Sequence, residues 1–329
     1  MPKTESQKLK LLYLMKLLLE RTDEEHALPA PKIIEGLAQY GIQAERKSIY
    51  DDIEVLRKFG LDIALRKSDG PGYFVASRTF ELPELKLLAD AVASSKFITE
   101  KKSEQLIRKI ELLTSRYQAV QLQRQVYVDG RVKTANERIY YSVDAIHQAI
   151  AQNRQISFRY FDYTADRKKE FRRNGEAYTA SPYALSWDSD NYYMIAYYER
   201  YGSLSHFRVD KMENTAVLEL PRRELPDGKA FDLTCYMRKL FGMFGGEEEE
   251  ICLRFSNSLI GVVLDRLGND ADIRKADGDS FTVRFRAFVS PALLGWIFKF
   301  GGDVKVLGPE ALKEQLRQKA EQCLAQTAG

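Results

Sequence analysis

The sequence contains little cysteine and little histidine. Among 329 residues there are three cysteines (Cys235, Cys252 and Cys323) and three histidines. The cysteines lie far apart and form no CxxC pair, which argues against a disulfide framework or a cysteine zinc site. So few histidines also argue against a histidine metal centre. Cysteines without a disulfide pattern are typical of a reducing compartment, so we expect a cytoplasmic protein with no bound metal.

Long apolar runs and the short motifs of common enzymes are also lacking. No stretch of about 18 uninterrupted apolar residues occurs, so we expect no transmembrane helix and no membrane partner. The chain begins with MPKTESQKLK, which lacks the apolar segment of a signal peptide. The sequence has no phosphate loop GxxxxGK(S/T), no nucleophile elbow GxSxG, no zinc motif HExxH and no helix-opening GxGxxG. We therefore expect a protein that is not an enzyme and that needs no cofactor.

The composition is that of an ordinary globular protein, with 44% hydrophobic and 29% charged residues. A length of 329 residues corresponds to two or three domains at about 150 residues each. The net charge is +3, but its distribution is uneven. Residues 98–175 contain 16 Lys and Arg against 9 Asp and Glu, whereas residues 247–329 contain 11 against 13. The middle of the chain is therefore suited to a polyanion, and the C-terminal part is slightly acidic.

Residues 1–78 have the pattern of a winged helix-turn-helix domain. Apolar residues at helical spacing predict three helices between residues 6 and 60, with a tight glycine-containing turn between the second and third. Two strand-like segments follow, one near Ile63 and one at residues 73–75, on either side of a turn-rich stretch. Helices joined in this way and followed by a two-stranded wing predict a DNA-binding domain.

The rest of the chain divides into four further parts. Residues 79–152 are mainly helical and predict a linker that also forms a dimer interface. Residues 153–225 contain short aromatic and β-branched segments about ten residues apart, which favours a small β-barrel or sandwich. Residues 226–248 predict a connecting helix, and residues 249–329 alternate strands and helices. The predicted fold class is therefore multidomain α+β, with a winged helix-turn-helix, a helical linker, a small barrel and a C-terminal α+β module.

Six residues are predicted to contact DNA. The recognition helix of a helix-turn-helix places its N-terminal residues against base edges. The residues at this place are basic or carry a hydroxyl group: Arg46, Lys47, Ser48 and Tyr50. Two basic residues of the wing, Arg66 and Lys67, are expected to reach the DNA backbone. Other interpretations stay open, namely a solvated first helical turn, half-buried packing for Tyr50, and an ordinary charged hairpin tip.

Several motifs give the chain a resemblance to a known family. Residues 48–56 read SIYDDIEVL, residues 181–185 read SPYAL, and residues 207–212 read FRVDKM. Together with WIFKFG at residues 296–301, they make nearly the whole chain similar to the WYL-domain transcriptional regulators. The triplet that names the family falls on Tyr-Tyr-Met at residues 192–194. The resemblance implies an Sm-like barrel that binds a nucleic-acid or nucleotide effector, followed by a C-terminal extension.

The barrel segment contains side chains suited to such an effector. Arginine forks bind phosphate, and tyrosines offer a stacking face and a hydroxyl group. The effector-binding candidates all lie on predicted strands: Arg159, Tyr160, Tyr183, Tyr193, His206 and Arg208. The alternatives are that the tyrosines belong to the barrel core or rim, that Arg208 pairs with Asp210, and that His206 is an ordinary satisfied residue. The basic run at residues 167–173 is either a polyanion patch or a solvated loop.

The sequence thus predicts a cytoplasmic transcription factor that responds to a ligand. The winged domain is expected to bind double-stranded DNA, and the barrel to sense a nucleotide or a single-stranded nucleic acid. A homodimer is expected, because it explains palindromic half-sites. Two other functions stay open: an RNA- or single-strand-binding protein that uses the barrel as its main site, and a scaffold for protein contacts.

Overall fold

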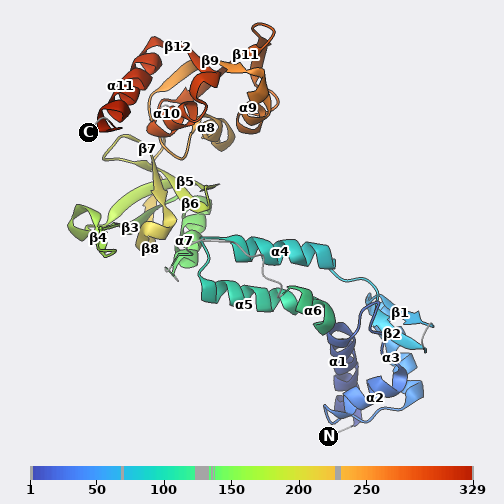
Figure 1. Cartoon of the computed structure of the whole chain (residues 1–329). Coiled ribbons are helices and arrows are strands. Elements are labelled where there is room, and N and C mark those ends of the chain that lie inside the picture. Colours follow the sequence, from blue (N-terminus) through green and yellow to red (C-terminus); the bar gives the residue numbers. More distant parts are fainter. Residues whose placement is uncertain are drawn as a thin grey trace. The chain divides into compact units, whose positions relative to one another are not determined.

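The computed structural model describes residues 3–67, 70–122, 133–134, 136, 138–226 and 231–327. The chain divides into two units, residues 1–137 and residues 138–329. Each unit has a hydrophobic core of its own, and Figure 1 follows the chain through both. The mixture of helices and antiparallel sheets confirms the predicted α+β class.

Three helices and a two-stranded hairpin begin the first unit. They are α1 (Lys3–Arg21), α2 (Ala30–Ala38), α3 (Arg46–Phe59), β1 (Ile63–Arg66) and β2 (Gly72–Val75). The two strands are antiparallel, with Ile63 opposite Val75. Ser68 and Asp69, which lie between the two strands in the sequence, are outside the described residues. The order of these elements is the one that the sequence predicts for residues 1–78.

The spacing of apolar residues explains how α3 packs. Ile49, Ile53 and Leu56 recur every three or four residues, and all three are buried in the core shared with α1 and α2. The helix ends at Gly60, whose φ of 110° is accessible at little cost only to glycine. Its amide donates to the carbonyl of Arg57. The opposite side of α3, from Lys47 along the helix, is left to solvent.

Three further helices complete the first unit: α4 (Leu82–Ser94), α5 (Glu100–Glu111) and α6 (Arg116–Leu122). They pack on one another, with Leu85 and Ala89 of α4 buried between them. The predicted helical character of this stretch is confirmed where the structure describes it. Residues 123–132, which belong to the predicted linker, lie outside the described residues.

A buried polar joint connects these helices to the N-terminal part. Asp23 accepts hydrogen bonds from the Ser115 hydroxyl group and from the His26 amide, and the His26 ring stacks on Tyr117 with centroids 3.7 Å apart. Burial opposes ionisation, but the bonds from Ser115 and His26 hold the pKa of Asp23 below its usual value. The joint therefore ties the turn after α1 to the start of α6.

A curled, half-barrel sheet forms the first part of the second unit (Figure 1). Its strands are β3 (Arg154–Tyr163), β4 (Lys169–Phe171), β5 (Tyr178–Asp188), β6 (Asn191–Tyr198), β7 (Ser203–Arg208) and β8 (Met212–Pro221). The order is β4-β3-β5-β6-β7, and β8 also pairs with β3, always antiparallel. We call this part the barrel. Its strands agree with the short segments that the sequence predicts for residues 153–225.

Helix α7 (Ile139–Ala151) packs on strands β3, β5 and β8 of the barrel. Its Ile146 and Ala149 are fully buried, and the hydroxyl of Ser142 is 3.0 Å from that of Thr215 on β8. The sequence assigned this helix to a linker that ended at residue 152. The structure differs because the buried side of α7 finds its apolar partners on the sheet.

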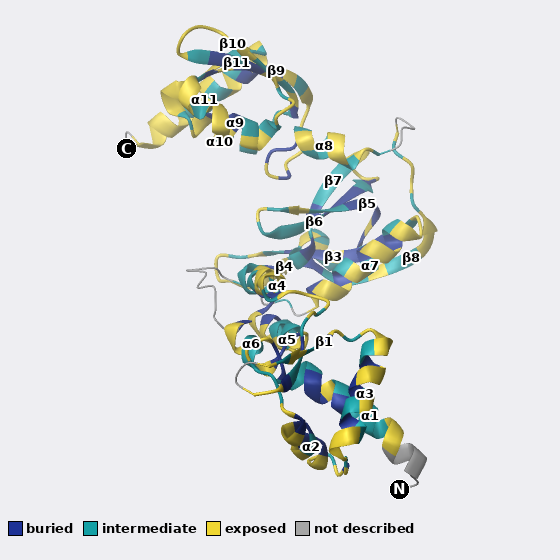
Figure 2. Cartoon of the chain, turned by 90° about the vertical axis from the view of Figure 1, so that its right-hand side faces the viewer, coloured by how far each residue is buried: buried dark blue, intermediate teal, exposed yellow. Residues whose placement is uncertain are grey.

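The C-terminal module alternates strands and helices. It contains β9 (Glu248–Ser256), α9 (Ile260–Leu267), β10 (Asp272–Lys275), β11 (Ser280–Phe288), α10 (Pro291–Phe298), β12 (Val304–Gly308) and α11 (Glu310–Thr327). The sheet order is β10-β11-β9-β12, all antiparallel, which is the split βαβ arrangement. The second half of α11 is largely exposed (Figure 2).

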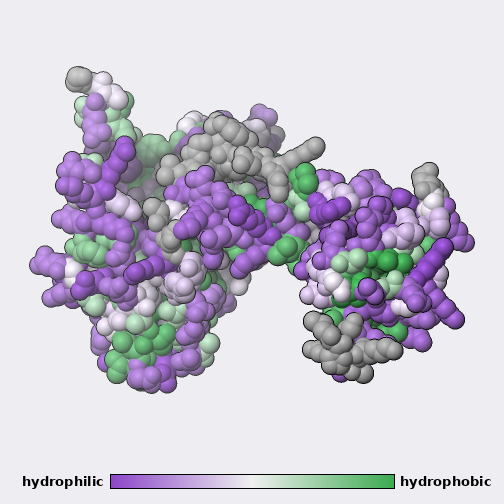
Figure 3. Space-filling view, turned by 90° about the horizontal axis from the view of Figure 1, so that it is seen from below, coloured by the Kyte–Doolittle hydropathy of each residue, from purple (hydrophilic) through white to green (hydrophobic). Residues whose placement is uncertain are grey.

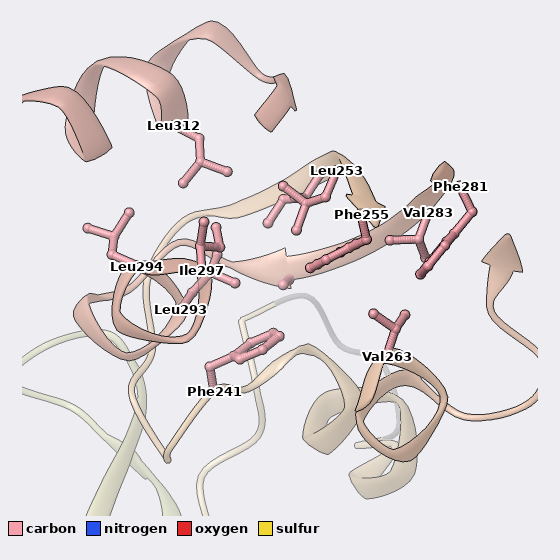
Figure 4. Close-up of a cluster of buried hydrophobic side chains, with 12 residues drawn as sticks. Phe241, Leu253, Phe255, Val263, Phe281, Val283, Leu293, Leu294, Ile297 and Leu312 are labelled. Carbon is pink, nitrogen blue, oxygen red and sulfur yellow. The ribbon is translucent and has the colours of Figure 1, made fainter. Parts of the chain in front are cut away.

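Residues 231–246, called here the connector, run from the barrel to the C-terminal module. The sequence predicts a long helix, but α8 spans only Leu233–Lys239, and residues 227–230 lie outside the described residues. Leu240 and Met243 pack against the barrel, whereas Phe241 enters the core of the C-terminal module. Figure 4 shows Phe241 and Leu312 of α11 reaching that core from opposite sides. Gly242 and Met243 have left-handed φ values of 59° and 58°, so a tight turn replaces the rest of the helix.

The surface in Figure 3 is mostly hydrophilic, with small hydrophobic patches. Within the described residues, no helix is long and apolar enough to cross a membrane.

Candidate nucleic-acid interfaces

The first turn of α3 and the hairpin meet at a cluster of polar aromatic residues. The Nε of Arg46 donates to the hydroxyl of Tyr50 at 2.5 Å, and its guanidinium lies 5.7 Å from the centre of that ring. The Tyr50 ring lies 6.1 Å from the ring of Tyr73 on β2. Burial and the nearby Tyr50 raise the pKa of Tyr73, so its hydroxyl group stays neutral. Arg46 and Tyr50 are therefore held at the junction of helix and hairpin.

Lys47 and Ser48 differ in their surroundings. Lys47 is exposed, and no ion pair of Lys47 occurs among the described residues. Ser48 accepts a hydrogen bond from the Nζ of Lys10, which also pairs with Asp52 at 2.7 Å. Ser48 thus holds α3 against α1, whereas Lys47 points away from the core.

Arg66 on β1 is turned back toward its own domain. Its Nη1 donates to the carbonyls of Glu25 at 2.7 Å and of Glu24 at 3.3 Å. Its Nε is buried and lacks a partner within the described residues. Lys67 is exposed next to the hairpin tip. The structure therefore gives Arg66 a bracing contact with the turn after α1, and Lys67 is the more accessible cation of the predicted pair.

In the barrel, an aromatic cluster lies beneath two arginines. The cluster consists of Phe158, Tyr160, Tyr178, Tyr198 and Phe207, whose ring centroids lie 5.0–6.3 Å apart in neighbouring pairs. The guanidinium of Arg172 lies 5.3 Å from the Tyr160 ring centre, and that of Arg173 lies 5.1 Å from the Tyr178 ring centre. Both arginines come from the turn that follows β4.

The turn that carries these arginines has an unusual backbone. Arg173 and Asn174 adopt left-handed φ angles of 55° and 53°, which are uncommon for residues other than glycine. Arg173 Nη1 donates to the Tyr198 hydroxyl at 2.9 Å, but its buried Nε has no partner among the described residues. Strained backbone clusters at functional sites, so we consider Arg173, together with its neighbour Arg172, candidate ligand-binding residues. In the sequence, these two arginines are visible only as part of the basic run at residues 167–173.

Three of the predicted effector residues come together from β3, β6 and β7. The Tyr160 hydroxyl accepts a hydrogen bond from the backbone amide of Arg208 at 3.1 Å, and Tyr193 lies opposite Arg208 on the adjacent strand. Arg208 donates to both oxygens of Asp210, at 3.0 and 2.7 Å, and to the side-chain oxygen of Asn191 at 2.9 Å. Burial raises the pKa of Tyr160 to about 12. Arg208 is therefore fixed in position, with its guanidinium partly neutralised.

Two more predicted effector residues lie elsewhere on the barrel. Arg159 is exposed, with its guanidinium 6.0 Å from the Phe171 ring centre. Tyr183 donates its hydroxyl to the carbonyl of Arg223 at 2.6 Å, and Arg222 stacks over its ring. The structure thus does not gather all six predicted residues into one site.

His206 lies between the barrel and the connector. Its Nε2 is 3.0 Å from the hydroxyl of Tyr236 on α8, and a backbone group of Met243 bonds to the ring. Burial lowers the pKa of His206 to about 4, although the bond to Met243 opposes this. His206 is therefore neutral near pH 7 and holds the connector, which is a poor arrangement for attracting an anion.

The pKa of His206 predicts how stability depends on pH. Because the folded-state pKa of about 4 is below the unfolded value of 6.5, protons favour the unfolded chain, and stability falls as the pH drops through this window. Each pKa unit is worth about 1.4 kcal/mol, so the loss reaches at most about 3 kcal/mol. We expect His206→Gln to show that much less pH dependence in urea unfolding between pH 6.5 and pH 4. Parallel pH profiles of the two proteins would contradict the assignment.

Comparison with known proteins identifies two domains. The family model of the WYL domain matches residues 141–217, and that of the WCX domain matches residues 247–324. The first match covers α7 and the barrel through most of β8, and the second covers the C-terminal module. No curated protein matches the chain.

Two solved structures resemble the chain at low sequence identity. Proteasome accessory factor B/C of Arthrobacter aurescens is 19% identical, with a TM-score of 0.29, over 98% of this chain and 49% of that chain. A second structure, described as a CRISPR Cas-related protein, is 14% identical, with a TM-score of 0.24, over 94% of this chain and 98% of that chain. The chain thus spans about half the length of the first of these structures.

Proposed function

We propose that this protein, which carries a WYL domain followed by a WCX domain, is a transcriptional regulator that binds duplex DNA through an N-terminal winged helix-turn-helix. The observation that carries the proposal is the exposed first turn of α3 beside the β1–β2 hairpin. In this arrangement α3 is the recognition helix and the hairpin is the wing. Neither the WYL nor the WCX match extends over these residues, so the DNA-binding role rests on this geometry and on the residues of α3.

The charge of α3 supports contact with phosphate. The first turn contains Arg46 and Lys47 and no acidic residue. Basic residues at a helix N-terminus oppose the helix dipole, which mildly destabilises the free helix. A bound phosphate satisfies both the exposed amides of the turn and its side chains. Arg46 and Lys47 are assigned to DNA contact, Tyr50 to a phosphate or to Arg46 itself, and Lys67 to the backbone beside the wing. Ser48 and Arg66 take part mainly by holding α3 and the hairpin in place.

The barrel is assigned to an effector that contains phosphate and a flat ring. Arg172 and Arg173 present cations above tyrosine faces, and Lys211 and Arg172 share the carboxylate of Asp162. Hydrogen bonds from Lys211 and Arg172, opposed by burial, lower the pKa of Asp162, which therefore stays charged. A nucleotide or a single strand competes with Asp162 for these cations, and its base can stack on the exposed guanidinium of Arg172, which covers the buried Tyr160 ring. For the effector to switch DNA binding, it must prefer one arrangement of a dimer.

A second candidate function uses the barrel as the main site. The arginine–tyrosine pairs of the barrel also suit RNA or single-stranded DNA without any role for α3. The two functions differ in which nucleic acid binds best, because only the first requires preference for duplex DNA.

Selection from randomised duplex DNA tests the proposal. The full-length protein is incubated with the library at about 0.15 M salt, which suppresses non-specific attraction, and the bound fraction is sequenced. We expect an enriched palindrome, with half-sites spaced by about one helical turn if the protein is a dimer. The selection is repeated with short single strands present. No enrichment in either selection, from a folded protein that still binds single strands, would favour the second candidate function.

A further inference from the structure

The sheet of the C-terminal module has one apolar face and one charged face. Leu253 and Phe255 of β9, with Phe281 and Val283 of β11, point into the core and are buried. Because side chains alternate along a strand, the residues between them point to the opposite face of the sheet. Arg254 and Arg284 occupy such positions, and both are exposed.

Strand pairing places basic residues in a row across this face. Lys305 on β12 lies opposite Arg254 on β9, Arg254 lies opposite Thr282 on β11, and Thr282 lies opposite Arg274 on β10. Strands are about 4.8 Å apart, so the row spans about 14 Å. Arg284 lies on β11 in the next row, opposite Cys252. We call Lys305, Arg254 and Arg284 the basic triad.

The basic triad is weakly neutralised by the rest of the module. Arg254 is 4.0 Å from Asp277, the limit of an ion pair, and no ion pair of Arg284 or Lys305 occurs within the described residues. Acidic groups on this face offset part of the charge. Asp272 lies opposite Arg284 but pairs with Arg274 at 3.0 Å, and Glu248 pairs with Lys239 at 2.8 Å. Glu250 lies further along β9, opposite Arg286.

The positive charge of the basic triad contrasts with the net charge of the C-terminal module. Residues 247–329 contain 11 basic and 13 acidic residues, so their net charge is −2. Cations that gather on one face of a slightly acidic module are not explained by its average composition.

We propose that the basic triad binds the sugar-phosphate backbone of a nucleic acid, at a site separate from α3 and from the barrel. Between the cations lie Cys252 and Thr282, which are small, so these rows offer no aromatic platform for bases and no large apolar anchor for a protein partner. Binding to phosphates needs only exposed cations in a row. The contact is therefore independent of base sequence.

A triple substitution tests the proposal. Arg254→Gln, Arg284→Gln and Lys305→Gln are introduced together into the full-length chain, and binding to a fluorescent twenty-nucleotide oligothymidylate is followed by anisotropy at several salt concentrations. The slope of log affinity against log salt should fall by about 2, since each contact to a single strand contributes about 0.7, and affinity at about 0.1 M salt should fall at least tenfold. If the triple variant does not fold, Arg284→Gln alone should lower the slope by about 0.7.

Three comparisons decide the result. The first is a control variant that removes the same charge from α11: Lys313→Gln, Arg317→Gln and Lys319→Gln. An equal loss of affinity in this control would show that the effect comes from net charge alone, and it would overturn the proposal. An unchanged salt slope in the basic-triad variant would also overturn it. If polyglutamate displaces the fluorescent probe as effectively as unlabelled oligothymidylate does, the basic triad binds an acidic protein segment and not a nucleic acid.

Arg172→Gln with Arg173→Gln separates this site from the barrel. If that variant abolishes oligothymidylate binding and the basic-triad variant does not alter it, the proposal fails while the proposed effector site stands. Duplex binding through α3 is measured separately, on the selected duplex.

Discussion

Replacing Arg46 and Lys47 together by alanine should lower the affinity of the full-length protein for its selected duplex by about 100-fold. A hydrogen bond from each cationic side chain to a phosphate is expected to contribute about 1.5–3 kcal/mol, and 1.4 kcal/mol corresponds to a factor of ten. Loss of two phosphate contacts should also reduce the salt slope by about 2. Binding is measured by anisotropy across a salt series, with the selected duplex and a scrambled one. Because both side chains are exposed at the start of α3, the fold should be retained.

The matched control removes the same charge from the same domain. Lys16 and Lys32 have exposed side chains on α1 and α2, and their alanine variants should leave duplex affinity within about threefold of the wild type. If Arg46→Ala with Lys47→Ala leaves affinity unchanged, α3 is not a recognition helix and the scaffold interpretation gains support. If the control falls as far, the attraction is general and not located at α3.

Phe241→Ala should cost about 3–5 kcal/mol of the free energy of unfolding of the C-terminal module, the range for large aromatic side chains in cores. Phe241 is 3% exposed, and its ring centroid lies 5.2 Å from that of Trp296. The guanidinium of Arg266 lies over the Phe241 ring, 4.1 Å from its centre. Its neighbours Leu240 and Met243 are anchored in the barrel, so the variant should also loosen the connector. Urea unfolding, followed by tryptophan fluorescence, measures the change.

Phe244→Ala is the internal control for this prediction. Phe244 lies three residues further on, forms a bridge with Phe241, and is 54% exposed. The same chemical change there should cost less than about 1 kcal/mol, because little apolar surface is withdrawn from water. Equal losses in the two variants would show that the turn, and not the burial of Phe241, supports the module.

The local pattern of apolar and polar residues was sufficient to predict most helices and strands and much of their order along the chain. In α3, the recurrence of Ile49, Ile53 and Leu56 predicted the helix and its buried side, and Gly60 predicted its end. Alternating and aromatic segments predicted the barrel strands. Two assignments differ from the structure: the long connecting helix and the place of α7. In both regions the local helix propensity does not determine where the residues pack. In the connector, Leu240, Phe241 and Met243 are drawn into two different cores, and this breaks the helix after Lys239.

The partners of the candidate site residues were harder to predict from the sequence. Arg208 paired with Asp210, an alternative that the sequence had already left open. For Arg66 and His206, residue type suggested a ligand, whereas the structure supplies internal partners that only folding brings near: the Glu25 carbonyl, 41 positions away, and Tyr236, 30 positions away. Arg172 and Arg173 were visible as charge, but their place over Tyr160 and Tyr178 depends on a left-handed turn in which only the third residue, Gly175, is a glycine.

What the sequence by itself determined was the class of protein: the helices and strands, the order of the parts, the motifs of the WYL and WCX domains, and the basic first turn of α3. The elements and their order follow from composition and from periodicities of two and 3.6 residues, which are local properties of the chain, whereas the motifs show a resemblance to a known family. The tertiary structure alone decided which cations are free and which are already bonded, and it brought Lys305, Arg254 and Arg284 from three strands onto one face. Such neighbourhoods arise from strand register and long-range packing, which join residues that are distant in sequence.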